Sequence, residues 1–404
     1  MKIMLDFITV RLKTGAAEYV RRVVYSLIDE LKRDAQADVE LYAVYNSVMP
    51  IAYEDLREPM LTKVWPVRFV DCKGTTIGAL AQDLGIDCLF IGCAQYAGEV
   101  LGAPKCRTIC VLHDVYDEEV LENNLLEIGR LSWHTTTNYL LNTIYLFAHI
   151  AVDRLRHSKV RNSRDTRMQS VVKMLTNNLD SHLVVVSDYT RSVAQYHWNL
   201  PDDRVKVLWS PERVFNSVDN AIANIDLKNL IDEGRRYFLL LGGNRMLKNT
   251  YKAIEAFRRY VQFDPNCYLV VIGGRYGGEN GRVIGLPYLS DNELCLAMSH
   301  CYALIYPTYF EGFGYPPIEA MHYGKPVLSS NATSIPEILG GGGGAIYFSP
   351  LYSSAIFRAM MLLKDSDYMA ICEKSRQQYE MIHKRQERDL KQLLSLILSK
   401  HRRG

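Results

Sequence analysis

The stretch ALIYPTYFEGFGYPPIEAMHYGKPVLSS, residues 303–330, is the most informative part of the sequence. Its apolar start predicts a buried strand that ends near Pro307, and a loop with Glu311 and two glycines follows. Pro316 and Pro317 suit the first turn of a helix, where an amide hydrogen has no partner within the helix. A second short apolar run at the end of the stretch predicts another strand. A strand, a helix and a strand in this order indicate a parallel sheet covered by helices.

The same alternation of short apolar runs and helical periods continues on both sides of this stretch. Strands are predicted at residues 2–8, 39–46, 67–72, 87–92, 107–113, 182–187, 205–210, 237–243, 267–274, 302–307, 326–330 and 345–348. Amphipathic helices fit between many of them, for example at 18–32 and 250–262. One doubly wound sheet rarely holds so many strands, so the pattern predicts an α/β protein with two domains.

The division between the domains is expected in the segment 209–232, which has a proline, several Asn and Asp residues and no clear strand. The sequence therefore predicts an N-terminal Rossmann-like domain over 1–208 and a C-terminal Rossmann-like domain over 209–384. Residues 385–404 are charged and carry leucine and isoleucine at helical spacing, which predicts a C-terminal helix. The glycine run 340–344 is expected to form a loop before the last strand.

Composition narrows the classes of protein. The chain has 404 residues, a formal net charge of +2, 48% hydrophobic and 23% charged residues. These values are ordinary for a globular protein, and the small net charge gives no reason to expect nucleic acid as a partner. The nine cysteines form no Cys-x-x-Cys pair, and we expect reduced, buried thiols in a reducing compartment. The N-terminus lacks a signal-peptide pattern and no stretch is apolar enough to cross a membrane, so a cytoplasmic location is expected.

Two carboxylates mark the loop and the helix that follow the strand of the quoted stretch. Glu311 lies on the loop, placed to accept hydrogen bonds from sugar hydroxyls, whereas Glu319 lies near the helix start and suits a vicinal diol such as ribose. Gly312 and Gly314, on either side of Phe313, let the backbone approach a ligand. The free amide groups of a helix N-terminus favour an anion. Because ligands bind at the carboxyl ends of strands in open α/β sheets, these residues predict one site for a sugar diphosphate.

A second cluster lies in LLLGGNRMLKNTYKAIEAF, residues 239–257. An apolar strand ends at Gly243, a polar loop carries Arg245 and Lys248, and a helix begins near Thr250. Two cations beside a helix N-terminus are suited to bind a diphosphate.

The order of these features resembles glycosyltransferase family 4 (group 1), the retaining enzymes with the GT-B fold. The Glu-x7-Glu motif of that family is present as EGFGYPPIE, residues 311–319, and the following GKPVLSS and IPEIL segments also match its pattern. The likeness is strongest over 237–350. It implies two facing Rossmann-like domains, a C-terminal crossover helix that returns to the N-terminal domain, and a nucleotide sugar bound by the second domain. It also implies that Arg245 and Lys248 stabilise the departing nucleoside diphosphate, although Arg245 lies closer to the lysine than in many members.

The resemblance adds two positions from the N-terminal half. The strand RTICVL runs into His113 and Asp114, which resembles the family's His-Asp step, where the histidine faces the donor sugar. After the first strand, Gly15 is the remaining glycine of a loop that the family often places near the diphosphate and the acceptor. The expected catalytic residues are His113, Arg245, Lys248 and Glu311. The expected donor-binding residues are Gly15, Gly243, Gly312, Phe313, Gly314 and Glu319.

Two other signals carry less weight. Asp365 and Asp367 imitate a metal-binding Asp-x-Asp motif, but they lie between two helical segments, where Asp is an ordinary helix cap. The run 154–167 holds six Lys or Arg residues and follows an apolar stretch. It fits contact with anionic lipid or with a lipid-diphosphate acceptor, and it fits a solvated helix face as well.

The expected function is transfer of a hexosyl group from a nucleotide diphosphate sugar to a glycan or lipid-linked saccharide acceptor, in surface polysaccharide biosynthesis. The resemblance implies retention of the anomeric configuration and no requirement for a metal or another cofactor. A peripheral contact with the inner face of the membrane and a homo-oligomer stay open, as do the sugar, the base and the acceptor. Two rivals also stay open, an epimerase or phosphorylase on the same scaffold and a non-catalytic sugar-nucleotide-binding subunit.

Overall fold

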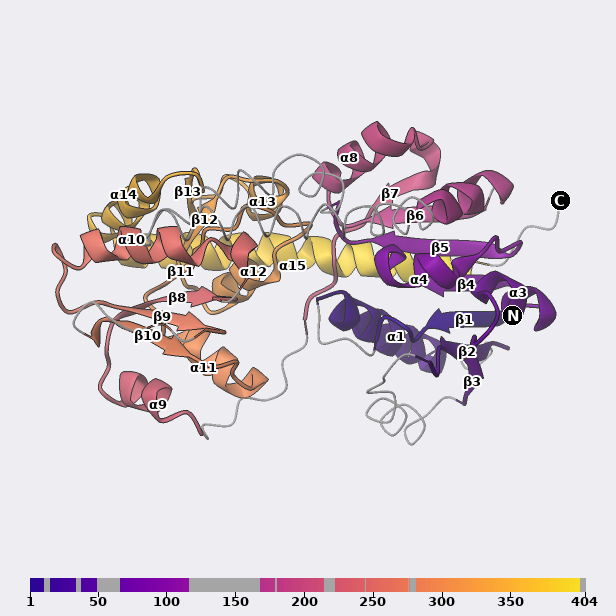
Figure 1. Ribbon diagram of the computed structural model, residues 1–404, viewed down its shortest axis with the longest axis horizontal. Helices are drawn as coiled ribbons and strands as arrows, with labels where there is room; N and C mark the ends of the chain where they lie inside the picture. The colour runs from indigo at the N-terminus through magenta and orange to yellow at the C-terminus, as the bar shows by residue number, and fades with distance from the viewer. Residues whose placement is uncertain are drawn as a thin grey trace, which may run out of the picture. The chain divides into compact units, whose positions relative to one another are not determined.

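The computed structural model describes residues 1–10, 15–33, 38–48, 66–115, 168–178, 180–213, 222–243, 245–274, 276 and 281–399. These residues fall into two compact units. Within the described ranges, the first unit holds residues 1–115, 168–213 and 385–399, and the second unit holds residues 222–384. Each unit is built on one parallel β-sheet with helices packed beside it (Figure 1). The predicted α/β fold with two Rossmann-like domains is thereby confirmed.

The first unit has a seven-stranded parallel sheet in the order β3-β2-β1-β4-β5-β6-β7. The strands are β1 Lys2–Asp6, β2 Glu40–Tyr45, β3 Val67–Asp71, β4 Cys88–Ile91, β5 Arg107–Leu112, β6 His182–Val185 and β7 Val205–Val207. The helices with assigned bounds are α1 Gly15–Arg33, α3 Ile77–Asp83, α4 Ala94–Leu101 and α8 Asp188–Trp198. All residues of β4 and β5 are buried, as expected for apolar strands that are covered on both faces.

The second unit has a six-stranded parallel sheet in the order β10-β9-β8-β11-β12-β13. The strands are β8 Tyr237–Leu241, β9 Tyr268–Ile272, β10 Val283–Leu286, β11 Ala303–Tyr306, β12 Val327–Ser330 and β13 Ala345–Phe348. The helices are α9 Ile225–Asp232, α10 Thr250–Tyr260, α11 Asp291–His300, α12 Tyr315–His322, α13 Ile335–Leu339 and α14 Ser353–Lys364. The last helix, α15 Tyr368–Leu398, begins in this unit and ends in the first.

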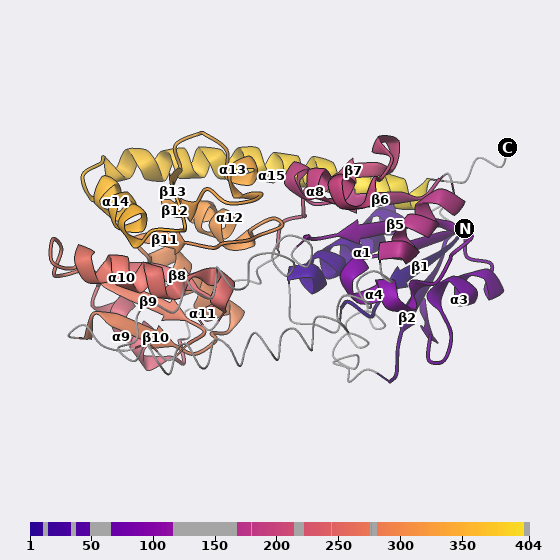
Figure 2. The same ribbon diagram turned by 45° about the horizontal axis from the view of Figure 1, so that its top comes forward.

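Side-chain alternation along the strands gives the second sheet two distinct faces. One face packs against α10 and α14, and its buried cluster includes Phe238 of β8 and Ile305 of β11. Figures 1 and 2 both draw these two helices side by side. On the other face, the Tyr237 hydroxyl donates to the carbonyl of Ala297 in α11 at 2.7 Å. Because successive strand residues point to opposite faces, Tyr306 at the end of β11 lies on this second face, with α11 and α12.

The end of α15 forms part of the first unit. The buried carboxylate of Asp389 accepts a hydrogen bond from the main-chain amide of Trp209 at 3.0 Å. Farther along, Arg107 of β5 donates to the carbonyl of Ile397 at 2.8 Å. The predicted C-terminal helix is thus confirmed, and it begins at Tyr368, before the predicted start at residue 385.

Two elements of the structure were not predicted from the sequence. Residues 225–232, expected within a linker, form α9, and the Asn224 side chain caps this helix by accepting from the Leu227 amide at 3.0 Å. Strand β10 was not predicted, because it is short and contains Gly285.

The discounted Asp-x-Asp sequence acts as a helix cap in the structure. Oδ1 of Asp367 accepts from the amide of Ala370 at 3.1 Å, at the start of α15. The basic run 154–167 lies outside the described residues. None of the helices in the described part of the chain combines the length and the apolar character that a membrane span requires.

Candidate functional site

Lys248 is placed by a tight turn between β8 and α10. The turn includes the short 3-10 helix Met246–Lys248. The Arg245 amide donates to the carbonyl of Gly242, and the Lys248 amide donates to the carbonyl of Arg245, both at 2.9 Å. Gly242 has a φ of +74°, and a Cβ there would lie 3.1 Å from Cγ of Lys248. The turn therefore brings the lysine back toward the carboxyl end of β8, whereas Arg245 is exposed.

The Lys248 ammonium group joins two residues that lie at or after the end of β11. Nζ donates to the hydroxyl of Tyr306 at 2.8 Å and forms an ion pair with Glu311. Nζ also lies 4.6 Å from the centroid of the Tyr306 ring. Only 11% of the lysine side chain and 19% of the glutamate side chain are exposed, so this pair is shielded from most of the solvent. Lys248 and Glu311 were predicted from separate sequence segments, and the structure brings them together at one edge of the sheet.

Further hydrogen bonds fix both the side chain and the main chain of Glu311. The Thr308 hydroxyl donates to its Oε1 at 3.1 Å. Its main-chain amide donates to Oγ1 of Thr333 at 3.1 Å, and its carbonyl accepts from the hydroxyl of Ser334 at 2.9 Å. The loop after β12 thereby holds the loop after β11.

The loop leads directly into α12, as predicted from the paired prolines. Pro316 and Pro317 occupy the first turn, and Gly314 precedes the helix with a φ of +93°. Phe313 and Glu319 are both buried, at 5% exposure each. The helix begins at the carboxyl end of β11, which is where ligands bind in open α/β sheets.

The phenol of Tyr306 lies within reach of several of the predicted charged residues. Its pKa is raised well above the usual range, first by burial and then by the negative charge of Glu311, to which it also hydrogen-bonds. The charge of Arg245 acts on the same phenol in the opposite sense, and that of Glu319 raises its pKa further. Lys248 and Glu311 therefore contact Tyr306, and the charges of Arg245 and Glu319 act on it. Tyr306 was not among the predicted site residues.

Gly243 serves a structural purpose at the end of β8. Its amide donates to the carbonyl of Ile272 at 2.9 Å, and its own carbonyl accepts from the hydroxyl of Tyr276. A Cβ on this glycine would lie 2.7 Å from Cγ1 of Val271. The amide is thus already used within the fold, and the glycine is needed because neighbouring side chains pack against it.

His113 and Gly15, the other two predicted positions, belong to the first unit. Nε2 of His113 lies 2.8 Å from the carbonyl oxygen of Gly92, so this nitrogen carries the hydrogen and Nδ1 is left as an acceptor. The His113 ring packs against the ring of Tyr19 in α1 in a T-shaped arrangement, with a centroid distance of 4.8 Å. Burial lowers the pKa of His113 to about 4, so the ring is neutral at pH 7. Gly15 is the exposed first residue of α1.

Asp6, at the end of β1, supports His113 through Gly92. Its carboxylate accepts from the Gly92 amide at 3.1 Å and from the Ile8 amide at 2.9 Å. Burial raises the pKa of this carboxyl group, and the hydrogen bonds that it accepts oppose that shift. A Cβ on Gly92 would lie 2.0 Å from Cγ2 of Val20, so only glycine fits between the strand and α1. This support could not be predicted from the sequence, because it joins residues from three separate elements.

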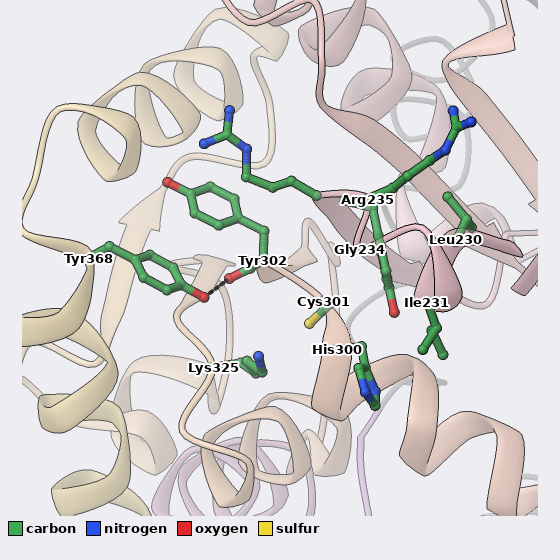
Figure 3. A pocket seen from close by; sticks show the side chains of 11 residues that line it. Leu230, Ile231, Gly234, Arg235, His300, Cys301, Tyr302, Lys325 and Tyr368 are labelled. Atoms are coloured by element: carbon green, nitrogen blue, oxygen red, sulfur yellow. Dashed lines mark hydrogen bonds between the residues drawn. The ribbon is translucent and has the colours of Figure 1, made fainter. Parts of the chain in front are cut away.

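A cavity of about 250 Å³ lies at the opposite edge of the second sheet, before β8 and β11 (Figure 3). Its lining includes Arg235, His300, Tyr302 and Lys325, and none of the predicted site residues. His300 is the last residue of α11, and Arg235 and Lys325 follow the ends of α9 and α12 closely, where positive charge offsets the negative end of a helix. Two of these side chains also have partners in the fold, because Nδ1 of His300 lies 2.9 Å from the carbonyl oxygen of Leu296 and Arg235 forms an ion pair with Glu233.

The comparisons with known proteins first define a class. Residues 222–381 match the family model of glycosyl transferases group 1. HepE of Anabaena, solved in complex with UDP and glucose, has a TM-score of 0.62 over 99% of this chain and 100% of that chain, at 14% identity. The chain therefore has the GT-B fold of known glycosyltransferase structures, and the predicted group 1 resemblance is confirmed for residues 222–381.

Two curated relatives match part of the chain. O-antigen chain mannosyltransferase B of Escherichia coli is 29% identical over 195 residues, which cover 44% of this chain and 51% of that protein. O-antigen chain mannosyltransferase RfbU of Salmonella typhimurium is 31% identical over 181 residues, which cover 42% of this chain and 47% of that protein. The chain thus matches about half the length of each of these two relatives.

Proposed function

We propose that the chain transfers a hexosyl group, most specifically a mannosyl group, from a nucleoside diphosphate sugar to a glycan or lipid-linked saccharide acceptor. The process that this would serve is the synthesis of a surface polysaccharide. The O-antigen mannosyltransferases among the relatives support the choice of sugar and of process. The observation that carries the proposal is the contact of Lys248 with Tyr306 and Glu311 at the carboxyl ends of β8 and β11.

In the proposed reaction, the two cations act on the leaving group. Lys248 and Arg245 stabilise the negative charge that grows on the diphosphate as the bond to the sugar breaks. Glu311 accepts hydrogen bonds from sugar hydroxyls, and Glu319 accepts from the ribose. Without a donor, Lys248 is neutralised by Glu311. A diphosphate carries more negative charge than one carboxylate, so it can compete for the ammonium group and leave Glu311 free for the sugar.

We also propose that transfer retains the anomeric configuration and proceeds without a divalent metal. The support for the second part is that two protein cations lie at the expected position of the diphosphate. A transfer rate that is unchanged by EDTA would agree with this proposal, whereas loss of activity that Mg²⁺ or Mn²⁺ restores would contradict it. NMR coupling constants of the product would identify its anomer and so decide between retention and inversion.

A two-stage experiment tests the proposed function. Thermal unfolding of the full chain is first followed with UDP, GDP and dTDP and with their mannose or glucose conjugates, because a ligand of the folded state raises the melting temperature. Transfer from the binding donor to a saccharide acceptor is then measured with radiolabelled sugar. Glu319→Ala should weaken donor binding about tenfold or more, because a charged hydrogen bond contributes roughly 1.5–3 kcal/mol.

The same experiment separates the rival functions. An epimerase would convert the donor sugar in the absence of an acceptor, and a phosphorylase would require inorganic phosphate. A non-catalytic subunit would bind the nucleotide sugar and leave it unchanged. Binding without transfer to any saccharide acceptor, or a donor affinity that Glu319→Ala leaves intact, would contradict the proposed transferase and its ribose contact respectively.

A further inference from the structure

Thr333 has an unusual backbone conformation beside the candidate site. It lies in the short loop between β12 and α13, and its φ is +52°. Among the described residues, the other non-glycine residues with positive φ are Asn199 and Asn249. Asparagine enters this region readily, whereas a β-branched residue such as threonine does so only under strain. The turn alone therefore does not explain why a threonine occupies this position.

The side chain of Thr333 makes a contact that explains this choice of residue. Its Oγ1 accepts the main-chain amide of Glu311 at 3.1 Å. The next residue, Ser334, is fully buried and donates its hydroxyl to the carbonyl of Glu311 at 2.9 Å. Two consecutive hydroxyl groups thus hold both main-chain polar groups of one residue. Lys248 and Thr308 hold the carboxylate of that same residue.

A purely structural account of this loop does not require threonine. Glycine adopts positive φ without steric cost, and it would make the same turn. Glycine would, however, lack the hydroxyl group that meets Glu311. Thr333 is itself only partly buried, so it is not one of the fully packed side chains of the hydrophobic core. Strained backbone that the surroundings hold in place is often found where it serves a site.

We propose that Thr333 is a positioning residue. Its hydroxyl, presented by the left-handed backbone, fixes the main chain of Glu311 so that the carboxylate meets the donor sugar in one orientation. This inference rests on the proposed transferase function and adds a determinant of the sugar site that makes no contact with the sugar itself.

Three variants test the role of the hydroxyl group. Thr333→Ser keeps it, Thr333→Ala removes it, and Thr333→Gly removes it together with the backbone strain. We expect the serine variant to retain kcat within about twofold. The alanine and glycine variants should each lose about tenfold in kcat at saturating donor, as expected for one lost hydrogen bond. The glycine variant should melt at a higher temperature than the alanine variant, because only glycine is free of strain.

The pattern across the variants distinguishes positioning from a structural role. If Thr333 only supports the fold, kcat should follow melting temperature, and the glycine variant should be the more active of the two. Hydrogen exchange of peptides that cover residues 308–314 gives an independent readout. It should quicken in the alanine and glycine variants and stay slow in the serine variant. Unchanged exchange in all three would overturn the proposed contact.

Failure of this inference is distinguishable from failure of the proposed function. Glu311→Gln serves as the reference. If Glu311→Gln loses transfer while Thr333→Gly retains the parent kcat, the positioning role is wrong and the transferase proposal stands. If the unmodified chain transfers sugar from none of the donors, the transferase proposal is wrong, and the catalytic part of the Thr333 inference is overturned with it.

Discussion

At the scale of single residues, Lys248 carries the largest share of the proposed chemistry. Its side chain is 11% exposed, and its ammonium group is neutralised by one carboxylate. A positive charge held in this way is already oriented before the donor arrives. Preorganised charge of this kind is the main means by which enzymes stabilise charge that develops in a transition state.

We therefore expect Lys248→Ala to lower kcat by about 100- to 1,000-fold, the range seen when one group that stabilises developing charge is removed. Acceptor KM should change little, because the lysine acts on the leaving diphosphate. Steady-state transfer kinetics would measure both. Lys228→Ala is a matched control, because Lys228 also forms an ion pair, with Asp232, but both side chains are exposed on α9. Equal kcat in Lys248→Ala and in the parent would contradict the assignment.

His113 gives a prediction about pH. Burial lowers its pKa to about 4, from an ordinary value near 6.5. The ring should therefore act as a neutral hydrogen-bonding group throughout the neutral range. His113→Gln should lower kcat/KM without changing the shape of its pH profile between about pH 6 and 8. An inflection near pH 6.5 that is present in the parent and absent in the variant would contradict this prediction.

The same shift predicts a contribution to stability. Between about pH 6.5 and pH 4 the unfolded chain binds a proton at His113 that the folded chain does not. Stability from this residue is therefore complete above pH 6.5 and decreases as the pH falls toward 4. Unfolding free energies measured at pH 7 and pH 5 should show a larger loss for the parent than for His113→Gln.

Some residues of the candidate site could be predicted from the sequence, and others could not. Lys248 and Glu311 could be predicted as site residues because their residue types and their places after strands suit the proposed chemistry. Tyr306 and Thr308 stand in the quoted stretch as ordinary strand-end residues, and only the folded geometry directs their hydroxyls at the charged pair. The positive φ of Thr333 is a property of the folded backbone, and the neighbouring residues in the sequence do not predict it.

At the scale of elements, apolar runs predicted the strands well because both sheets are covered by helices. The strand ends were harder. The first strand was expected to reach residue 8, but it ends at Asp6, whose side chain accepts from the amides of Ile8 and Thr9 and turns the chain out of the sheet. Strand β10 was missed because it contains Gly285. A Cβ there would lie 2.2 Å from the main-chain nitrogen of Tyr276, so the strand needs a glycine.

The start of α12 gives a prediction at this scale. Gly314 has a φ of +93°, and a Cβ there would lie 2.6 Å from Cδ1 of Ile335. Gly314→Ala should destabilise the second unit by roughly 1–3 kcal/mol, through backbone strain and the displaced isoleucine. Donor affinity should fall as well, because the helix N-terminus would shift. Urea unfolding and donor titration would measure the two effects.

Gly341→Ala is the matched control for this change. Gly341 lies in the glycine run before β13, and a Cβ there would meet nothing within 4 Å. Its substitution should leave both stability and donor affinity near those of the parent. Equal unfolding free energies for the two alanine variants would show that α12 does not depend on glycine at its start.

At the scale of the whole molecule, the end of the chain completes the unit in which the chain begins. Residues of α15 from 385 onward belong to the first unit, although they follow the whole second unit in sequence. Asp389 is 2% exposed and accepts from the Trp209 amide at 3.0 Å. It also forms ion pairs with Arg385 and Arg388. The last helix therefore contributes a buried polar anchor to the first unit, beside its apolar residues.

We expect the two units to unfold in two separate thermal transitions. A nucleoside diphosphate that binds beside Lys248 should raise the melting temperature of the second unit and so identify its transition. Asp389→Ala should lower the other transition, because the Trp209 amide and Arg385 lose their acceptor. We expect a loss of about 1–3 kcal/mol, as for a buried donor left without a partner. Glu387→Ala, at an exposed position of the same helix, should change little. Calorimetry with and without nucleotide would assign the transitions. If Asp389→Ala lowered only the nucleotide-sensitive transition, the end of α15 would be stabilising the second unit instead.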